Sequence, residues 1–130
     1  MTIPYDLLLK GVRVVRPHGN AVHEADIAVT GGKVAKVAPG IDAALAKTVY
    51  NGGGRLAFPG VVDAHMHAGI YSPLAEDAVT ESQAAALGGV TSSLNYFRIG
   101  QYYLNQGGPY SKFFPIVLKL SQKRFHVDYG

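Results

Sequence analysis

A run of three glycines, Gly52 to Gly54, separates two parts of the chain whose apolar residues follow different periods. From Asp6 to about Val37, apolar and polar residues alternate with the period of two that half-buried strands show. After Gly54 the candidate strands are apolar on both sides, and helical segments separate them. This second pattern is typical of a parallel sheet covered by helices. The sequence therefore predicts an α/β chain that divides into residues 1–54 and residues 55–130.

Turn residues divide the first part into short strands. Gly31 and Gly32 form a two-residue linker that permits the positive φ angles of a tight hairpin, and Pro17 to Asn20 marks another turn. A short helical turn is expected over residues 41–47, and one more strand over residues 48–50. The strands between Asp6 and about Val37 are expected to form a small antiparallel meander.

The second part is predicted to contain three strands and two helices. The first helix is expected to begin with Asp77 as its N-cap residue and to stop at Gly88-Gly89. The second helix is expected over roughly residues 113–123, where Pro115 is tolerable because it lies near the helix start. The expected strands cover residues 56–63, 90–97 and 125–129.

Composition and charge narrow the classes of function. The 130-residue chain has no cysteine, which excludes disulfides and thiolate metal sites. Its formal charge of +3 comes from scattered lysines and arginines, a distribution that argues against nucleic-acid binding. Its start lacks a signal-peptide pattern, and no stretch approaches the roughly 20 apolar residues that span a bilayer. We therefore expect a cytoplasmic protein without nucleic-acid or membrane partners.

Two histidines, His65 and His67, follow directly on the first apolar strand of the second part. Residues two apart on a strand project from the same face, with Cα atoms about 6.5 Å apart. Both imidazoles can then reach one metal ion, at about 2.0–2.1 Å for zinc. On this spacing alone, two ordinary surface or packed histidines are the favoured interpretation. The position at the carboxyl end of an apolar strand favours the metal site, since barrel enzymes build their active sites there.

Four segments carry a resemblance to a known family. They are residues 58–67 (FPGVVDAHMH), residues 25–34 of the meander (ADIAVTGGKV), residues 76–91 around the alanine-rich helix, and the terminal residues 127–130. Together they resemble the opening of the amidohydrolase superfamily, and most closely its hydantoinase, dihydropyrimidinase, allantoinase and dihydroorotase branch. The resemblance implies the N-terminal part of a composite β-sandwich in residues 1–54. For residues 55–130 it implies the first three strands and two helices of a metal-dependent (β/α)8 barrel, incomplete in this chain.

The resemblance also implies a set of metal ligands. In the family, two histidines after the first barrel strand bind the more buried metal of a binuclear site, and His65 and His67 match them. Zinc is the expected divalent metal. The other family ligands are a carbamylated lysine, two further histidines and a catalytic aspartate, which come from later strands that this sequence does not contain. We expect a barrel of this type to need around 250 residues.

The activity implied by the resemblance is hydrolysis of a cyclic amide by a metal-activated hydroxide. Hydantoins, dihydropyrimidines and related ureides or imides are the expected small-molecule substrates. The chain is expected to be inactive without the remaining barrel, which a complementary C-terminal polypeptide would supply. The complete enzyme is expected to form a homo-oligomer.

The chain departs from the family pattern after the two histidines. Dihydroorotases of this branch carry an arginine there, whereas Ala68 to Tyr71 hold no cation, which counts against dihydroorotase activity. Arg98 follows the second strand and is the candidate for binding an anionic or carbonyl group of the substrate. An ordinary surface arginine on a loop is the alternative interpretation.

Several neighbouring residues have two open interpretations. Asp63, two residues before His65, is expected on the same strand face, where it either orients a ligand imidazole or serves packing. Tyr96-Phe97 and Tyr102-Tyr103 either line a substrate pocket or are buried under a loop. A structural role is expected for the remaining histidines, His18, His23 and His126.

A protein of another class is the main alternative to a cyclic amidase. Non-catalytic members of the dihydropyrimidinase-like branch keep the fold as a scaffold or interaction module. Retention of His65 and His67 favours the enzyme, since a scaffold has no need of them.

Overall fold

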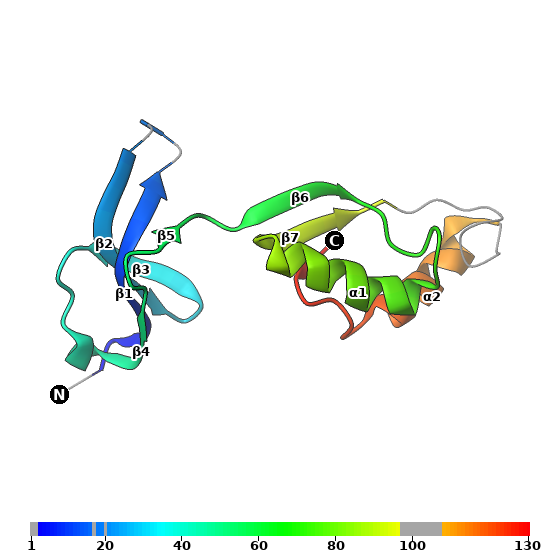
Figure 1. Ribbon diagram of the computed structural model, residues 1–130. Helices are drawn as coiled ribbons and strands as arrows, with labels where there is room; N and C mark the ends of the chain where they lie inside the picture. The colour runs from blue at the N-terminus through cyan, green and yellow to red at the C-terminus, as the bar shows by residue number, and fades with distance from the viewer. Residues whose placement is uncertain (1–2, 17, 20, 97–107) are drawn as a thin grey trace. The chain divides into compact units, whose positions relative to one another are not determined.

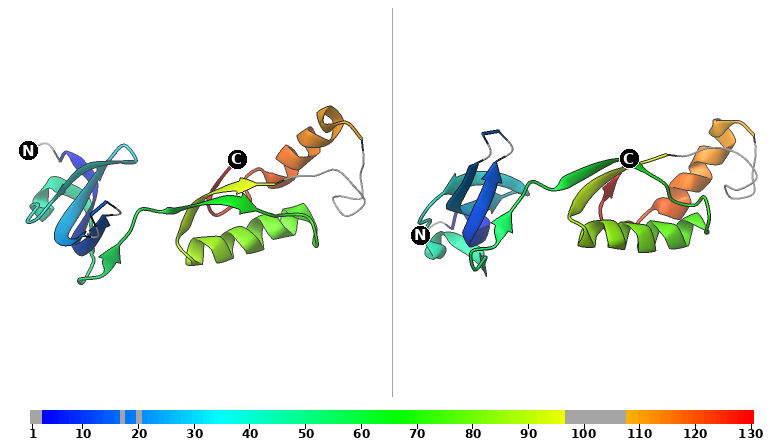
Figure 2. Two further views of the ribbon diagram at one scale, coloured as in Figure 1. Left: turned by 90° about the horizontal axis from the view of Figure 1, so that it is seen from above. Right: turned by 45° about the horizontal axis from the view of Figure 1, so that its top comes forward.

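The computed structural model describes residues 3–16, 18–19, 21–96 and 108–130. The chain splits into two compact units, Met1–Pro59 and Gly60–Gly130, and each is described by itself. Figures 1 and 2 show the strands of the first unit and the strands and helices of the second. None of the described helices is long and apolar enough to cross a bilayer.

The first unit is a sheet built around β1, with strand order β3-β2-β1-β4 and β5 as a further partner of β1. The pairs β1–β2 and β2–β3 are antiparallel, as the alternating pattern predicts. Both β4 and β5 run parallel to β1, a direction that the sequence did not predict for the strand expected over residues 48–50. Its elements are β1 (Tyr5–Arg16), β2 (Ala21–Thr30), β3 (Lys33–Ala38), the 3-10 turn η1 (Ala43–Leu45), β4 (Ala46–Asn51) and β5 (Leu56–Ala57).

Glycines with positive φ angles form the turns and bulges of this sheet. Gly31 and Gly32 have φ angles of 57° and 74° and close the β2–β3 hairpin as predicted. Gly11, with a φ of 66°, lies where the β1–β2 register shifts between Leu9 and Val12. A glycine in the left-handed region at such a shift is typical of a bulge, which bends the strand and strengthens its twist.

The core of the first unit is small. Leu8, Ala28 and Ile41 are buried together, and Tyr5, Ala38 and Ala46 pack around them. Beside it, the buried carboxylate of Asp26 accepts hydrogen bonds from the amides of Gly11 at 2.7 Å and Ile41 at 2.8 Å. Asp26 thus ties the bulge in β1 to the segment that follows β3.

The boundary between the units lies later than the division expected after Gly54. Leu56 and Ala57 pair with Arg13 and Val14 of β1 and so belong to the first sheet. The single strand expected over residues 56–63 is therefore wrong: it is two strands with a break at Pro59-Gly60. Proline has no amide hydrogen to donate to the hydrogen bonds between strands, so Pro59 interrupts the strand.

The second unit is a parallel sheet with strand order β6-β7-β8. The predicted succession of strand, helix, strand, helix and strand is confirmed. The last strand is shorter than expected: of the predicted residues 125–129, only Asp128 and Tyr129 pair with β7. The ring of Phe125 stacks on that of Tyr129. The elements are β6 (Val61–Met66), α1 (Leu74–Leu87), β7 (Val90–Asn95), α2 (Tyr110–Ser121) and β8 (Asp128–Tyr129).

The helix ends correct two predictions and confirm one. Helix α1 begins after Pro73, so Asp77 is a first-turn residue and not the N-cap. Helix α2 begins at Tyr110, so Pro115 lies inside it and not near its start. Gly88 caps α1, and Gly89 follows with a φ of 90°, which is the predicted stop.

One hydrophobic cluster holds the helices of this unit together. Helix α1 packs against β7 and α2, and Figure 1 shows it along one side of the β6–β7 strands. The cluster consists of Ala68, Ile70, Leu74, Phe113 and Val117, with Leu120 and Phe125 packed against it. It includes residues directly after His67, so the segment that follows the histidine pair is part of the core.

Candidate functional site

The imidazoles of His65 and His67 converge at the carboxyl end of β6. Their Nε2 atoms lie 3.0 Å apart and their ring centroids 4.8 Å apart. Both side chains are exposed. The shared strand face predicted from the spacing is therefore present, with one nitrogen of each ring directed to a common point.

This distance suits two chemical situations. Without a cation, one neutral ring donates its Nε2–H to the other Nε2, and the tautomers decide the direction. With a cation, two nitrogens about 2.05 Å from one zinc ion lie about 3.3 Å apart at a tetrahedral angle and 3.0 Å apart at an angle of about 94°. The observed separation is thus within reach of a shared metal after a small adjustment of the rings.

A β-bulge changes the face on which Asp63 lies. Asp63 pairs with Ser93, and Met66 pairs with Asn95, with a register shift between the two pairs. Ser93 and Asn95 share a face of β7, so Asp63 shares the face of Met66 and not that of His65. The expectation that Asp63 and His65 lie on one face is therefore wrong.

The carboxylate of Asp63 instead holds the backbone of the bulge. Its Oδ1 accepts a hydrogen bond from the amide of His65 at 3.0 Å. A side chain that accepts from an amide two residues on stabilises a local turn. Asp63 therefore contacts the main chain of His65, and the structure records no hydrogen bond between its carboxylate and the described imidazoles.

The segment after His67 is anchored from α1. Asp77, in the first turn of the helix, accepts a hydrogen bond from the amide of Gly69 at 2.8 Å. Gly69 has a φ of 80°, and its neighbours Ala68 and Ile70 are buried in the core cluster. The chain leaving His67 is thus held by an acceptor and by packing.

Tyr96, directly after β7, is the aromatic neighbour of the histidine pair. Its ring is nearly parallel to that of His65, with centroids 5.7 Å apart and an interplanar angle of 13°. It meets the ring of His67 edge-on, at 5.4 Å and 77°. Sequence reasoning named Tyr96 only as a pocket or burial residue and missed this contact. Its place after the second parallel strand, beside the end of the first, was the available signal.

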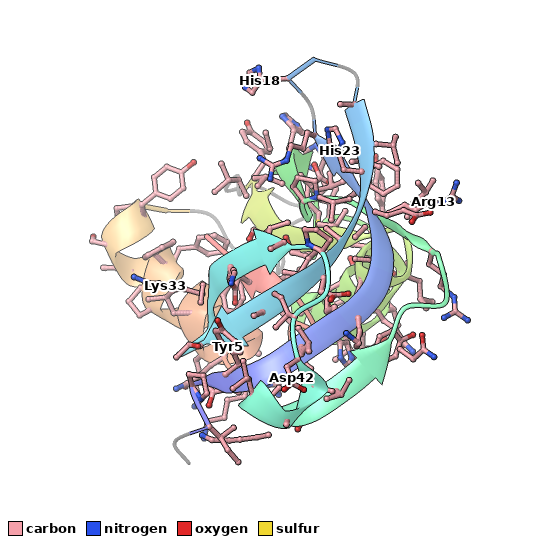
Figure 3. The ribbon with its side chains drawn as sticks, turned by 90° about the vertical axis from the view of Figure 1, so that its left-hand side faces the viewer. Tyr5, Arg13, His18, His23, Lys33 and Asp42 are labelled. Carbon is pink, nitrogen blue, oxygen red and sulfur yellow. The ribbon has the colours of Figure 1, made fainter. Side chains whose placement is uncertain are left out.

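The other candidate residues do not join this group in the described part of the chain. Arg98 lies outside the described residues, as do Phe97, Tyr102 and Tyr103. His18 and His23 belong to the first unit, where Figure 3 shows His18 at the tip of the β1–β2 hairpin. His126 is exposed, and its backbone amide donates to Ser82 Oγ at 2.9 Å.

The histidine pair has no third candidate ligand beside it among the described residues, and the cavity found in the second unit lies elsewhere. Within residues 3–16, 18–19, 21–96 and 108–130, no group of three or more His, Cys, Asp or Glu side chains is arranged to hold a metal. A cavity of about 470 Å³ in the second unit is lined by Val90, Thr91, His126 and Asp128, among others. It lies at the amino ends of β7 and β8, whereas the histidine pair is at the carboxyl end of β6.

Comparison with known proteins identifies relatives of this chain. No family model matches it. It is 42% identical over 91 residues to an allantoinase of Bacillus velezensis, an alignment that covers 68% of this chain and 19% of the allantoinase. It is 33% identical over 90 residues to a dihydroorotase of Geotalea daltonii, covering 67% of this chain and 21% of that enzyme. An adenine deaminase of Deinococcus radiodurans is 45% identical over 62 residues, 48% of this chain and 11% of the deaminase.

A comparison with solved structures finds similar enzymes. The L-hydantoinase (dihydropyrimidinase) from Arthrobacter aurescens superposes with a TM-score of 0.71 and 27% identity, over 97% of this chain and 27% of the hydantoinase. The chain is homologous to the N-terminal part of amidohydrolase-family enzymes. The family resemblance predicted from residues 58–67 and the flanking segments is thereby confirmed. The alignments cover only part of these relatives, from 11% of the adenine deaminase and 19% of the allantoinase to 27% of the hydantoinase.

Proposed function

We propose that His65 and His67 are two ligands of a divalent metal ion, with zinc as the expected metal, in a hydrolase of cyclic amides. The observation that carries this proposal is the 3.0 Å separation of the two Nε2 atoms at the carboxyl end of β6. The homology to enzymes named allantoinase, dihydroorotase and hydantoinase supports the reaction class.

The donor set fits such an ion in part. Neutral imidazole nitrogen is a preferred ligand of zinc, and manganese or iron also bind at sites that carboxylates and a carbamate complete. A catalytic zinc site needs three protein ligands, and the described residues bring two together. We infer that the remaining ligands, and those of a second metal, come from other residues, which we assign to a complementary C-terminal polypeptide.

A bound divalent cation would supply Lewis-acid chemistry, acidifying water and polarising the amide carbonyl. The chain's own residues have simpler tasks in this proposal. His65 and His67 hold the ion, and Asp63 fixes the main chain at the entry to His65 by accepting a hydrogen bond from its amide. The Tyr96 ring lies against both imidazoles, stacked on His65 and edge-on to His67.

The same proposal extends to the architecture. We infer that the first unit is part of a β-sandwich and that β6, β7 and β8 are the first three strands of a (β/α)8 barrel. The large exposure of Val61, Val62 and Leu94 supports this, since strands of a parallel sheet are normally covered on both faces. In a complete barrel these side chains would be covered by neighbouring strands and layers of interior residues.

The substrate proposed is a cyclic ureide or imide other than dihydroorotate. Residues Ala68 to Tyr71 offer no cation beside the histidine pair, and a substrate carboxylate would need one. Arg98 remains the proposed contact for an anionic or carbonyl group of the substrate. The similarity to a dihydroorotase makes this exclusion worth testing directly.

The test measures metal content and turnover on the complete protein, meaning this chain assembled with the complementary C-terminal polypeptide. His65→Ala/His67→Ala is compared with His18→Ala/His23→Ala, a matched double substitution of two exposed histidines in the first unit. We expect the first variant to lose bound metal and all hydrolysis of hydantoins, dihydropyrimidines or allantoin, and the second to keep both. Unchanged metal content in the first variant would contradict the site.

The substrate panel also separates the two classes of function. Preferred turnover of dihydroorotate would contradict the proposed substrate class, and adenine is included because of the adenine deaminase relative. A complete protein that binds no metal and hydrolyses none of these compounds would instead support the non-catalytic scaffold.

A further inference from the structure

The three rings of His65, His67 and Tyr96 form one cluster. Each ring contacts both of the others, with centroid separations of 4.8, 5.7 and 5.4 Å. Tyr96 is 49% exposed, so the core does not require its aromatic ring there. The ring instead lies against the two side chains that converge at the candidate metal site.

The backbone fixes Tyr96 in this position. Its amide donates to the carbonyl of Met66 at 2.8 Å, and Met66 is the residue between the two histidines. Asn95, the preceding residue, pairs with Met66 across the β6–β7 ladder. Since neighbours on an extended chain point to opposite faces, Tyr96 projects to the face opposite Asn95 and Met66, which is the face of the imidazoles.

This contact restricts rotation of exposed imidazoles. An exposed side chain ordinarily samples several rotamers, and the described hydrogen-bond partner of each imidazole Nε2 is the other ring. A ring stacked on His65 and edge-on to His67 removes rotamers that would separate their nitrogens. The pair is therefore arranged before any ion arrives, which reduces the ordering cost of binding.

We propose that Tyr96 is a positioning residue for the His65/His67 pair: its aromatic ring, and not its hydroxyl, keeps the two Nε2 atoms directed at one point. The inference rests on the proposed function, because it assigns Tyr96 a role in the same metal site. It predicts that any planar aromatic side chain of similar size at position 96 serves, and that an aliphatic one does not.

The experiment uses Co²⁺ and Zn²⁺ as probes on the full chain. Affinity is measured by competition with a chromophoric chelator, and ligand geometry by the visible absorption of bound Co²⁺. Tyr96→Leu should bind Co²⁺ about tenfold more weakly, the lower end of the effect seen when residues that orient metal ligands are removed, with a changed spectrum. Tyr96→Phe should restore both to within about twofold of the unsubstituted chain.

Tyr110→Leu is the matched control, since Tyr110 is 53% exposed and lies on α2. It should change neither affinity nor spectrum. Unaltered Co²⁺ affinity in Tyr96→Leu would overturn the inference and leave the metal site standing, provided that His65→Ala/His67→Ala still loses the ion. Binding that survives the double histidine substitution would overturn both.

A measurement on the metal-free, unsubstituted chain avoids any dependence on how the variants fold. Nuclear Overhauser contacts between the Tyr96 ring protons and both imidazoles are expected. If the Tyr96 ring contacts neither imidazole in solution, the inference is wrong.

Discussion

At the scale of single residues, Asp26 is a buried polar group that joins two segments of the first unit. Asp26 is 4% exposed, and its carboxylate accepts hydrogen bonds from two amides, with the Lys10 ammonium 3.4 Å away. Burial raises the pKa of Asp26. The hydrogen bonds from Gly11 and Ile41 and the charge of Lys10 lower it, and their combined effect is larger than that of burial. The pKa of Asp26 therefore lies below its usual value, and the ionised form is the one the fold stabilises.

We expect Asp26→Asn to lower the free energy of unfolding by about 2–3 kcal/mol at pH 7, because an amide cannot replace a carboxylate that accepts two amide hydrogens and faces an ammonium. Since the folded-state pKa is depressed, the contribution is present above about pH 4, the unfolded-state value, and is lost as the pH falls further. Urea unfolding between pH 7 and pH 3 should show the difference between the two proteins shrinking with acid. Asp6→Asn, at an exposed carboxylate, should have little effect at pH 7. A difference that is independent of pH would contradict the assignment.

Asp63 shows how a β-bulge can make a prediction from strand alternation wrong for a single residue. His65 and His67 share a face as the spacing predicts, whereas Asp63 does not, because a bulge inserts one residue between Asp63 and Met66. Bulges are common beside functional sites, where they redirect side chains. The bulge leaves Asp63 to bind the amide of His65.

At the scale of elements, two buried serines have different surroundings. Ser82 in α1 accepts from the amide of His126, which ties the helix to the segment before β8, and it also donates to the carbonyl of Ala78. Ser121, at the end of α2, has a buried hydroxyl without a hydrogen-bond partner in the described residues. Replacing serine with alanine should therefore change the stability differently at the two positions.

We expect Ser82→Ala to destabilise the protein by about 1–2 kcal/mol, because the amide of His126 loses its acceptor. Ser121→Ala should be neutral or slightly stabilising, since it removes an unsatisfied buried hydroxyl. Thermal unfolding followed by circular dichroism compares the two variants, and hydrogen exchange at the amide of His126 reports the local effect. Equal destabilisation by both substitutions would contradict this account.

At the scale of the whole molecule, the second unit holds two candidate ligands of a site that needs more. The described residues contain no third partner for the ion, and the exposed side chains of β6 and β7 lack a covering layer. The proposed function therefore requires further ligands from residues outside the described part of this chain.

We therefore expect these 130 residues alone, supplied with Zn²⁺, to hydrolyse no member of the cyclic-amide panel. Adding a polypeptide that carries the remaining ligands should produce metal-dependent turnover, measured by ring-opening of hydantoin or dihydrouracil in the ultraviolet. The same mixture made with His65→Ala/His67→Ala should stay inactive. Turnover by the 130 residues alone would show that the site is complete without a partner.

The sequence by itself determined the features that depend on local interactions. These are the β2–β3 hairpin at Gly31-Gly32, the order of strands and helices after Gly60, and the shared face of His65 and His67. Each follows from backbone preferences or from the period of a single element, so neighbouring residues contain the necessary information.

Only the tertiary structure decided the features that depend on pairing between distant segments. The parallel pairing of β5 with β1 moved the boundary to Pro59, and the β6–β7 register placed Asp63 on the other face. The contact of Tyr96 with both imidazoles needs the end of β7 beside the end of β6. Such contacts arise from the energy of packing whole elements together, which no local pattern in the sequence records.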